Sequence, residues 1–336
     1  YNLYKNMKKI LIIGGCGFIG HNLAIHLNNL NYKVDIVDSL NVNNLNNFKE
    51  NVGNNEFYRL VLNNRLELLA RNNINYEIID ARDYHALSKF IGHCRPDVII
   101  HLAAVSHANK SNKDPHSTFD HSLRTLENAL DATRSISAHF IYLSSSMVYG
   151  NFDGEIVDEN RVLNPMGIYG TLKVCGEYIV KSYNEVFDIP YTIIRPSALY
   201  GERCVSRRVG QIFIENAIRG QKIIINGDGK EKLDFTYIKD LIKGITLCIE
   251  KEKSKNEIFN LTYGEGRSIN ELIAILAKTF PSIEVEKKER EKFTPERGTL
   301  SIDKAKKLLS YNPEYPIEKG YLSYINWYSG FFNNKT

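Results

Sequence analysis

A glycine-rich turn near the amino end places the strongest constraint on the fold. Its glycines follow an apolar run, Lys9 to Ile13, and precede a stretch with helical periodicity. A strand that turns tightly into a helix is the first half of a β-α-β unit. The first glycine permits the turn, the second lets a ligand approach the backbone, and the third lets the helix pack on the strand. These glycines are Gly14, Gly17 and Gly20.

Further apolar runs alternate with helical periodicity over the first 195 residues. They are apolar throughout, as are strands that helices cover on both faces. The sequence therefore predicts an α/β fold with a doubly wound parallel sheet. The expected strands are Lys9 to Ile13, Lys33 to Asp38, Tyr76 to Ile79, Asp97 to His101, Ala138 to Leu143 and Pro190 to Arg195.

The turn also has the context that a dinucleotide fingerprint requires, because a helix amino end offers free N–H donors to a pyrophosphate. Asp38 ends the second strand, where a carboxylate binds adenosine ribose hydroxyls and repels a 2′-phosphate. Asp35 is a rival that falls mid-strand. Asp80 and Ala81 end the third strand, and Asp80 either meets the adenine or caps a helix. We therefore expect NAD rather than NADP.

Glycines break the chain into short segments after Arg195, which indicates a smaller, loop-rich C-terminal lobe. We expect residues 7–195 to form the NAD-binding domain, with residues 236–262 returning to it. Residues 196–235 and 263–335 would form the substrate-binding lobe. A helix in the long connection after Asp38 would cover the cofactor or form a subunit contact. The helix expected in this connection is Glu56 to Arg71, and the helices expected after Arg195 are Asp240 to Glu250, Asn270 to Thr279 and Asp303 to Leu309.

Tyr169 and Lys173 stand four residues apart, which advances a helix by roughly 400° and leaves both side chains on one face. A phenol with a pKa near 10 is a poor base at neutral pH, but a nearby positive charge lowers its pKa. We therefore expect Lys173 to lower the pKa of Tyr169, so that Tyr169 takes a proton from a substrate hydroxyl.

Three serines, Ser144 to Ser146, follow the strand that ends at Leu143. The carboxyl ends of parallel strands are where ligands bind in open α/β sheets. One of these hydroxyls is expected to touch the substrate and to relay its proton toward Tyr169. A plain serine-rich turn is the alternative.

Composition excludes several other classes of protein. The 43 basic and 39 acidic residues are interspersed, which argues against nucleic-acid binding. The five cysteines are far apart and odd in number, as in reduced cytosolic proteins, and no His, Cys and carboxylate cluster has metal-ligand spacing. The polar amino end and the short apolar runs give no signal peptide or membrane span. We expect a cytoplasmic protein without a metal.

Together these motifs resemble the extended short-chain dehydrogenase/reductase family, in particular its nucleotide-sugar epimerases and dehydratases. The resemblance covers nearly the whole chain and implies a Rossmann domain that binds NAD. It also implies that Tyr169 is the base, that Lys173 binds the nicotinamide ribose, and that Ser145 assists. Beyond the glycine turn and Tyr169 to Lys173, it rests on His101-Leu102-Ala103-Ala104, Ser144-Ser145-Ser146-Met147-Val148-Tyr149-Gly150, Arg195-Pro196-Ser197-Ala198-Leu199-Tyr200-Gly201, Asn226-Gly227-Asp228-Gly229, Asp234-Phe235-Thr236-Tyr237-Ile238-Lys239-Asp240 and Arg297-Gly298.

The expected ligand contacts follow from these motifs and from the cations near them. Cofactor contacts are expected at Gly14, Gly17, Phe18, Ile19, Gly20, Asp38, Asp80, Ala81, Leu102, Ala103, Ala104, Tyr169 and Lys173. Substrate contacts are expected at Ser145, Ser146, His107, Arg207, Arg208 and Arg297.

The residues after Ser145 bear on the reaction. Family members that eliminate water usually carry Asp-Glu, or at least Glu, at that place, whereas this chain has Ser146 and Met147. Without that acid and base, elimination is disfavoured. The leading prediction is C4 epimerisation of a nucleotide sugar, most readily a UDP-sugar, through a 4-keto intermediate. The alternatives are a 4-oxidoreductase, a 4,6-dehydratase or, in another class, a non-catalytic NAD-sensing scaffold.

Three residues depart from the family pattern. Relatives often have Asn in place of Ala198, Arg in place of Leu233 and Asn in place of His121. Because the first two usual residues help to hold the nucleotide diphosphate, anion binding is expected to pass to neighbouring cations. Lys232 and Arg207 either take part in this or lie on a solvated surface. The resemblance also implies a homodimer packed through helices that start near Pro115 and Pro165.

Overall fold

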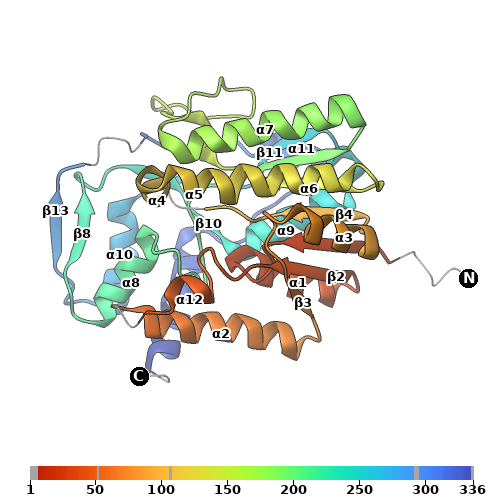
Figure 1. The fold of residues 1–336 in the computed structure, drawn as a ribbon. Helices are drawn as coiled ribbons and strands as arrows, with labels where there is room; N and C mark the ends of the chain where they lie inside the picture. Colours follow the sequence, from red (N-terminus) through yellow and green to blue (C-terminus); the bar gives the residue numbers. More distant parts are fainter. Residues whose placement is uncertain (1–6, 51–52, 106–107, 291–294, 334–336) are drawn as a thin grey trace, which may run out of the picture.

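The computed structural model describes residues 7–50, 53–105, 108–290 and 295–333. In this part of the chain, seven strands form one parallel sheet, which confirms the predicted doubly wound α/β fold (Figure 1). In spatial order they are β11 (Glu257–Asn260), β6 (Tyr191–Arg195), β5 (His139–Leu143), β4 (Val98–His101), β1 (Lys9–Ile13), β2 (Lys33–Asp38) and β3 (Tyr76–Ile78).

Helices cover both faces of this sheet (Figure 1). On one face α1 packs against α2 and α9, and on the other α6 packs against α3 and α7. The described helices are α1 (Phe18–Asn29), α2 (Asn55–Arg71), α3 (Tyr84–Cys94), α4 (Ala108–Lys113), α5 (Pro115–Phe119), α6 (Thr125–Thr133), α7 (Gly167–Phe187), α8 (Val209–Ile218), α9 (Ile238–Glu250), α10 (Ile269–Thr279), α11 (Asp303–Leu309) and α12 (Ile317–Asn333). Short helical turns are η1 (Leu45–Phe48), η2 (Asp120–Arg124), η3 (Ser146–Tyr149) and η4 (Glu252–Ser254).

The residues of β1 show why its sequence is apolar throughout. Ile10 and Ile12 belong to the hydrophobic core on one face of the sheet, whereas Leu11 and Ile13 belong to the core on the other. Successive strand residues point to opposite faces, so a strand covered twice requires apolar residues at every position. All six expected strands are present with bounds within one residue of the prediction; β11 is a seventh, unpredicted strand.

The chain reverses its winding between β1 and β4. From β1 it proceeds outward to β2 and β3, and it then crosses back to β4 on the other side of β1. At such a switch point the loops after the two neighbouring strands separate, and ligands bind in the crevice at their carboxyl ends. The glycine turn after β1 and Leu102-Ala103-Ala104 after β4 lie at this crevice.

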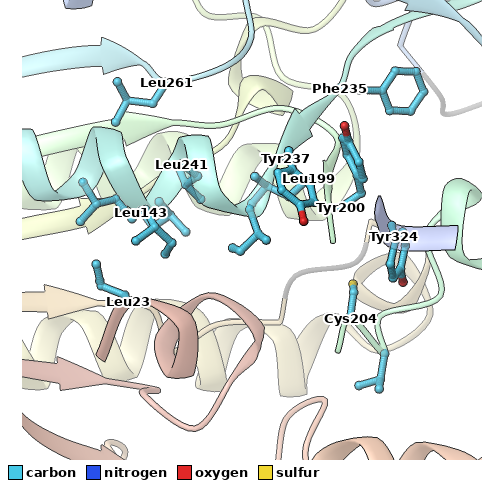
Figure 2. Close-up of a cluster of buried hydrophobic side chains, with 14 of the residues drawn as sticks. Leu23, Leu143, Leu199, Tyr200, Cys204, Phe235, Tyr237, Leu241, Leu261 and Tyr324 are labelled. Atoms are coloured by element: carbon cyan, nitrogen blue, oxygen red, sulfur yellow. The ribbon is translucent and has the colours of Figure 1, made fainter. Parts of the chain in front are cut away.

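Three two-stranded sheets lie outside the main sheet and together with α8, α10 and α12 build a second region. α10 begins where Ser268 and Glu271 form a reciprocal capping box. Figure 2 shows one apolar cluster that extends through both regions, from Leu23 of α1 and Leu241 of α9 past Tyr200 to Tyr324. The small sheets pair β7 (Leu199–Tyr200) with β10 (Thr236–Tyr237), β9 (Lys232–Asp234) with β12 (Gly266–Ser268), and β8 (Ile223–Asn226) with β13 (Val285–Lys288).

None of the helices in the described ranges combines the length and the apolar character that crossing a bilayer requires.

Candidate active site

The turn after β1 leaves no room for side chains at its glycines Gly14 and Gly20. Gly14 has φ of 83°, and a Cβ there would lie 2.9 Å from the Ala103 backbone nitrogen. A Cβ on Gly20 would lie 2.5 Å from the Cα of Gly15, where α1 packs on the turn. The glycines therefore bring bare backbone and the amino end of α1 to the edge of the sheet.

A pocket opens at this edge, and every predicted cofactor residue outside α7 lines it. Arg65 of α2 and His121 of η2 also line the pocket. Two roles were predicted for the helix after Asp38, and the position of Arg65 supports the role of covering the cofactor site. The predicted residues are Gly14, Gly17, Phe18, Ile19, Gly20, Asp38, Asp80, Ala81, Leu102, Ala103 and Ala104.

Asp38 lies at the end of β2 with its carboxylate fixed by backbone groups. It accepts hydrogen bonds from the Cys16 nitrogen at 3.0 Å and the Leu40 nitrogen at 2.7 Å. Burial raises the pKa of Asp38, and these bonds and the charge of Arg65 oppose the rise. Its rival Asp35 lies in mid-strand, in register with Leu11 of β1. Asp38 is thus the carboxylate at the pocket.

Asp80 also lines the pocket and forms a salt bridge of 2.6 Å with Arg82. Burial favours a higher pKa for Asp80, but the hydrogen bonds and charge of Arg82 outweigh it and lower the pKa. The alternative that Asp80 caps the next helix is wrong, because the Asp83 side chain accepts the capping hydrogen bond from Ala86.

α7 and the end of β5 bring the three predicted catalytic residues together. Lys173 donates a hydrogen bond of 2.6 Å to the Leu143 carbonyl, and its Nζ lies 6.0 Å from the centroid of the Tyr169 ring. The hydroxyls of Tyr169 and Ser145 share a hydrogen bond. Tyr169, Lys173 and Ser145 line one cavity of about 540 Å³. A hydroxyl, a phenol and an ammonium are thus held side by side, as proton transfer requires.

The expected pKa shift of Tyr169 is wrong in direction. Burial raises the pKa of Tyr169, and the positive charges of Arg208 and Arg297 and the hydrogen bond from Ser145 offset this only in part. Burial also lowers the pKa of Lys173 to about 8, against the opposing charge of Glu177. Spacing along a helix does not reveal how completely both groups lose water, and that desolvation dominates here.

The three serines have different partners. The Ser144 hydroxyl donates to Glu177 at 2.5 Å, and the same carboxylate forms a buried salt bridge of 2.6 Å with Arg195. Ser144 is therefore structural, since it ties the end of β5 to α7. Ser145 bonds Tyr169, and the buried Ser146 hydroxyl has no hydrogen-bond partner within the described ranges. Both Ser145 and Ser146 line the cavity and remain candidates for substrate contact.

The cavity is strongly basic. Arg208, Arg297 and the exposed Arg207 all line it, as predicted, and Lys232, Arg290 and Lys173 add positive charge. Glu231 is the one carboxylate among the described lining residues. The Arg297 Nε and the Glu231 Oε2 are buried without a hydrogen-bond partner in the described part of the chain. A site with this charge is suited to an anionic ligand.

The cofactor pocket and this cavity are continuous. Ile19, Leu102, Ala104, Leu199 and Arg208 line both. A dinucleotide that begins at Asp38 therefore leads toward Tyr169 and Lys173.

The residues that depart from the family pattern are at the site. His121 lines the cofactor pocket, and burial lowers its pKa. Ala198 and Leu233 line the cavity with apolar side chains. His107 lies outside the described residues.

Comparison with known proteins decides the family. The model of the NAD dependent epimerase/dehydratase family matches residues 10–262. The chain belongs to this family. NAD is therefore its cofactor, and the glycine turn and Asp38 provide the backbone cradle and ribose carboxylate that NAD requires. Epimerisation and dehydration are the reactions of this family.

Individual relatives of this epimerase/dehydratase include both kinds of enzyme. An uncharacterized UDP-glucose epimerase of Bacillus subtilis is 30% identical, covering 97% of this chain and 100% of the relative. The human dTDP-D-glucose 4,6-dehydratase is 27% identical, covering 97% of this chain and 91% of the relative. The UDP-glucuronic acid 4-epimerase of Bacillus cereus, solved with UDP-glucuronic acid and NAD, is 28% identical, with a TM-score of 0.84 and coverage of 95% of this chain and 98% of that one.

Among the charged lining residues that the sequence analysis missed are Arg65 and Glu231. Each is a charged residue with other polar residues beside it, Asn63 and Asn64 before Arg65 and Lys230 and Lys232 around Glu231, and therefore looks in the sequence like a solvated surface residue. No motif marked either one, because only the packing of distant segments brings it to the ligand site.

Proposed function

We propose that this protein is an NAD-dependent 4-epimerase of a nucleotide-activated sugar, most readily a UDP-sugar. The observation that carries the proposal is the set Ser145, Tyr169 and Lys173 at the wall of a basic cavity that continues into the cofactor pocket. The positive charge suits a nucleotide diphosphate. The similarity to epimerases of UDP-glucose and UDP-glucuronic acid supports the same substrate class.

In this proposal Tyr169 takes the proton of the sugar 4-hydroxyl as the 4-keto sugar forms, and Ser145 hydrogen-bonds the same oxygen. Bound NAD would supply the acceptor and donor of the C4 hydride. Lys173 holds a positive charge beside Tyr169, while the charges of Arg208 and Arg297 oppose the increase in the pKa of Tyr169 that burial causes. The 4-keto sugar must turn over before the proton and hydride return, and a cavity of about 540 Å³ provides room for that motion.

Dehydration is the alternative within the family. It needs an acid for the leaving hydroxyl and a base for the adjacent carbon. The two positions after Ser145 hold Ser146 and Met147, and Glu231 is the one carboxylate among the described lining residues. This disfavours elimination. A 4-oxidoreductase and a non-catalytic NAD sensor are further alternatives, but a sensor would not require the Tyr169 and Lys173 pair.

Proton NMR of the purified protein with NAD and a panel of UDP-, GDP-, CDP- and dTDP-sugars tests the proposal, with uronates and N-acetylhexosamines included. We expect one sugar to convert to its C4 epimer without net NADH. A 4-keto product with loss of water would establish a dehydratase instead, and accumulation of NADH would establish an oxidoreductase. The same panel with Tyr169→Phe controls for conversion of a sugar that does not depend on the proposed active site.

Three further predictions accompany this proposal. We propose that residues 196–235 and 263–335 act as the substrate-binding lobe, that the protein functions in the cytoplasm, and that it forms a homodimer through the two helices that start near Pro115 and Pro165, the second of which is α7. The large side chains of Tyr178 and Val186 on α7 are exposed in the single chain, which supports such a contact. Sedimentation at micromolar concentration should give twice the mass of the chain; a monomer would exclude the dimer.

A further inference from the structure

Arg65 is a buried cation at the cofactor pocket that no motif assigns. It lies on α2, is 1% exposed and lines the pocket together with Asp38 and the glycine turn. Its Nη1 atom is buried and has no hydrogen-bond partner within the described residues. A buried N–H of a charged group is costly when it lacks a partner. A bound ligand that accepts a hydrogen bond from Nη1 would remove this cost.

Two reciprocal links hold Arg65 in place. Its Nε and Nη2 donate to the Arg203 carbonyl at 3.0 and 2.5 Å. The Arg203 side chain in turn donates to Asn64, the neighbour of Arg65, at 2.8 Å. These bonds join α2 to the segment 201–208, which contributes Val205, Ser206 and Arg208 to the same pocket. The guanidinium therefore has a fixed orientation and does not depend on a surface rotamer.

The surrounding charges do not neutralise Arg65. Asp38 attracts it, but the carboxylate of Asp38 is already bonded to the backbone nitrogens of Cys16 and Leu40. Burial lowers the pKa of Arg65 to about 10, which leaves it charged at neutral pH. The anions that NAD brings to this pocket are the two phosphates of its pyrophosphate, because NAD carries no 2′-phosphate.

We propose that Arg65 donates a hydrogen bond through Nη1 to the pyrophosphate of NAD, and that α2 and the segment 201–208 form a clamp that retains the cofactor. Arg65 is then a cofactor-binding residue that lies outside the glycine turn. The clamp acts through the same side chain, because its other two donors hold the segment 201–208.

Calorimetric titration of Arg65→Met with adenosine, ADP-ribose, NAD and NADP tests this contact directly. The loss of a charge-assisted hydrogen bond should weaken ADP-ribose and NAD roughly 10- to 100-fold. Adenosine lacks phosphate, so its affinity should change less than about 3-fold. Arg71→Met is the matched control, since Arg71 is an exposed arginine at the end of the same helix, and it should leave all four affinities unchanged.

Several outcomes would overturn the proposal. An equal loss for adenosine and ADP-ribose would mean that Arg65 only shapes the pocket, and unchanged affinities would mean that it makes no contact. A loss confined to NADP would place it at a 2′-phosphate. If Arg65→Met does not fold, Arg65→Lys keeps the buried charge, but its single nitrogen lacks the planar fork that directs separate N–H groups to the Arg203 carbonyl and to a phosphate. It should weaken ADP-ribose several-fold relative to adenosine; an unchanged ratio would equally refute the contact.

Discussion

The cofactor pocket and the substrate cavity are built in different ways. The pocket is formed mainly by the ends of neighbouring strands, and its carboxylates are bonded to the protein, as Asp38 is to Cys16 and Leu40; its one buried donor without a partner, among the described residues that line it, is the Arg65 Nη1. The cavity collects side chains from distant segments and leaves buried polar atoms of Ser146, Glu231 and Arg297 without partners in the described part of the chain. This difference separates a pocket built for one cofactor from a cavity whose open polar atoms are suited to select the substrate.

The largest expected effect tests the proposed catalytic residues, which line the cavity. Tyr169→Phe removes the proposed base and should lower kcat by roughly 10³-fold or more, while NAD binding changes little. Tyr149→Phe is the matched control, because the Tyr149 hydroxyl bonds Arg195 and Asn260. Measured turnover and NAD affinity of both variants check the prediction.

Full turnover by Tyr169→Phe would remove Tyr169 as the base. If instead Tyr169→Phe lost NAD binding as well, the pocket and the cavity would not be separable at this residue, and the comparison between them would fail.

The same contrast explains which features were predictable from the sequence. The glycines at 14, 17 and 20 and the pair Tyr169 and Lys173 are local patterns, and one strand or helix suffices to place them. The strands were predictable because β1 and its neighbours are covered on both faces. Local rules therefore describe the sheet and its edge.

The rest depends on packing between distant segments. Arg65 and Glu231 reach the site only through tertiary contacts, and neither carries a sequence signal of its role. The pKa of Tyr169 is raised because burial outweighs the nearby charges, and burial is not visible in a helical spacing. Electrostatics that depend on desolvation therefore required the folded structure.

A smaller effect is expected from the cations of the cavity. Arg297→Met should raise KM for the nucleotide sugar roughly 10- to 100-fold and lower kcat less, because it removes a charge-assisted contact from the ground state as well as the transition state. Arg207→Met, at the exposed edge of the cavity, should change KM less than about 3-fold. Steady-state kinetics of the two variants also decide between the anion-binding and solvated roles of Arg207.

Equal effects of Arg207→Met and Arg297→Met would show that the cavity attracts substrate by its general charge. A loss in kcat alone for Arg297→Met would mean that Arg297 acts on Tyr169, whose pKa its charge helps to lower, and does not bind the substrate.

The smallest effect concerns the pH dependence that Lys173 imposes. Burial holds the pKa of Lys173 at about 8, below its usual 10.5, so the ammonium is present at neutral pH and is lost as the pH rises through 8. For stability the sign is opposite: the charged form disfavours the fold below pH 8, and this cost disappears between pH 8 and 10.5. We expect kcat/KM to fall above an apparent pKa near 8.

Glu177→Gln tests whether a buried network sets that limit. The charge of Glu177 raises the pKa of Lys173. Removal of this charge should therefore move the alkaline limb of the pH profile of kcat/KM to lower pH by less than about one unit. The variant also weakens the bond to Arg195, which lowers thermal stability, but instability alone reduces activity at every pH and leaves the position of the limb unchanged. Tyr149→Phe removes one hydrogen bond to Arg195 without changing the charge. It should therefore lower the free energy of unfolding by about 1 kcal/mol and leave the position of the alkaline limb unchanged. A limb that moves equally in both variants would assign the effect to packing, and an unmoved limb in Glu177→Gln would mean that the titrating group is not Lys173.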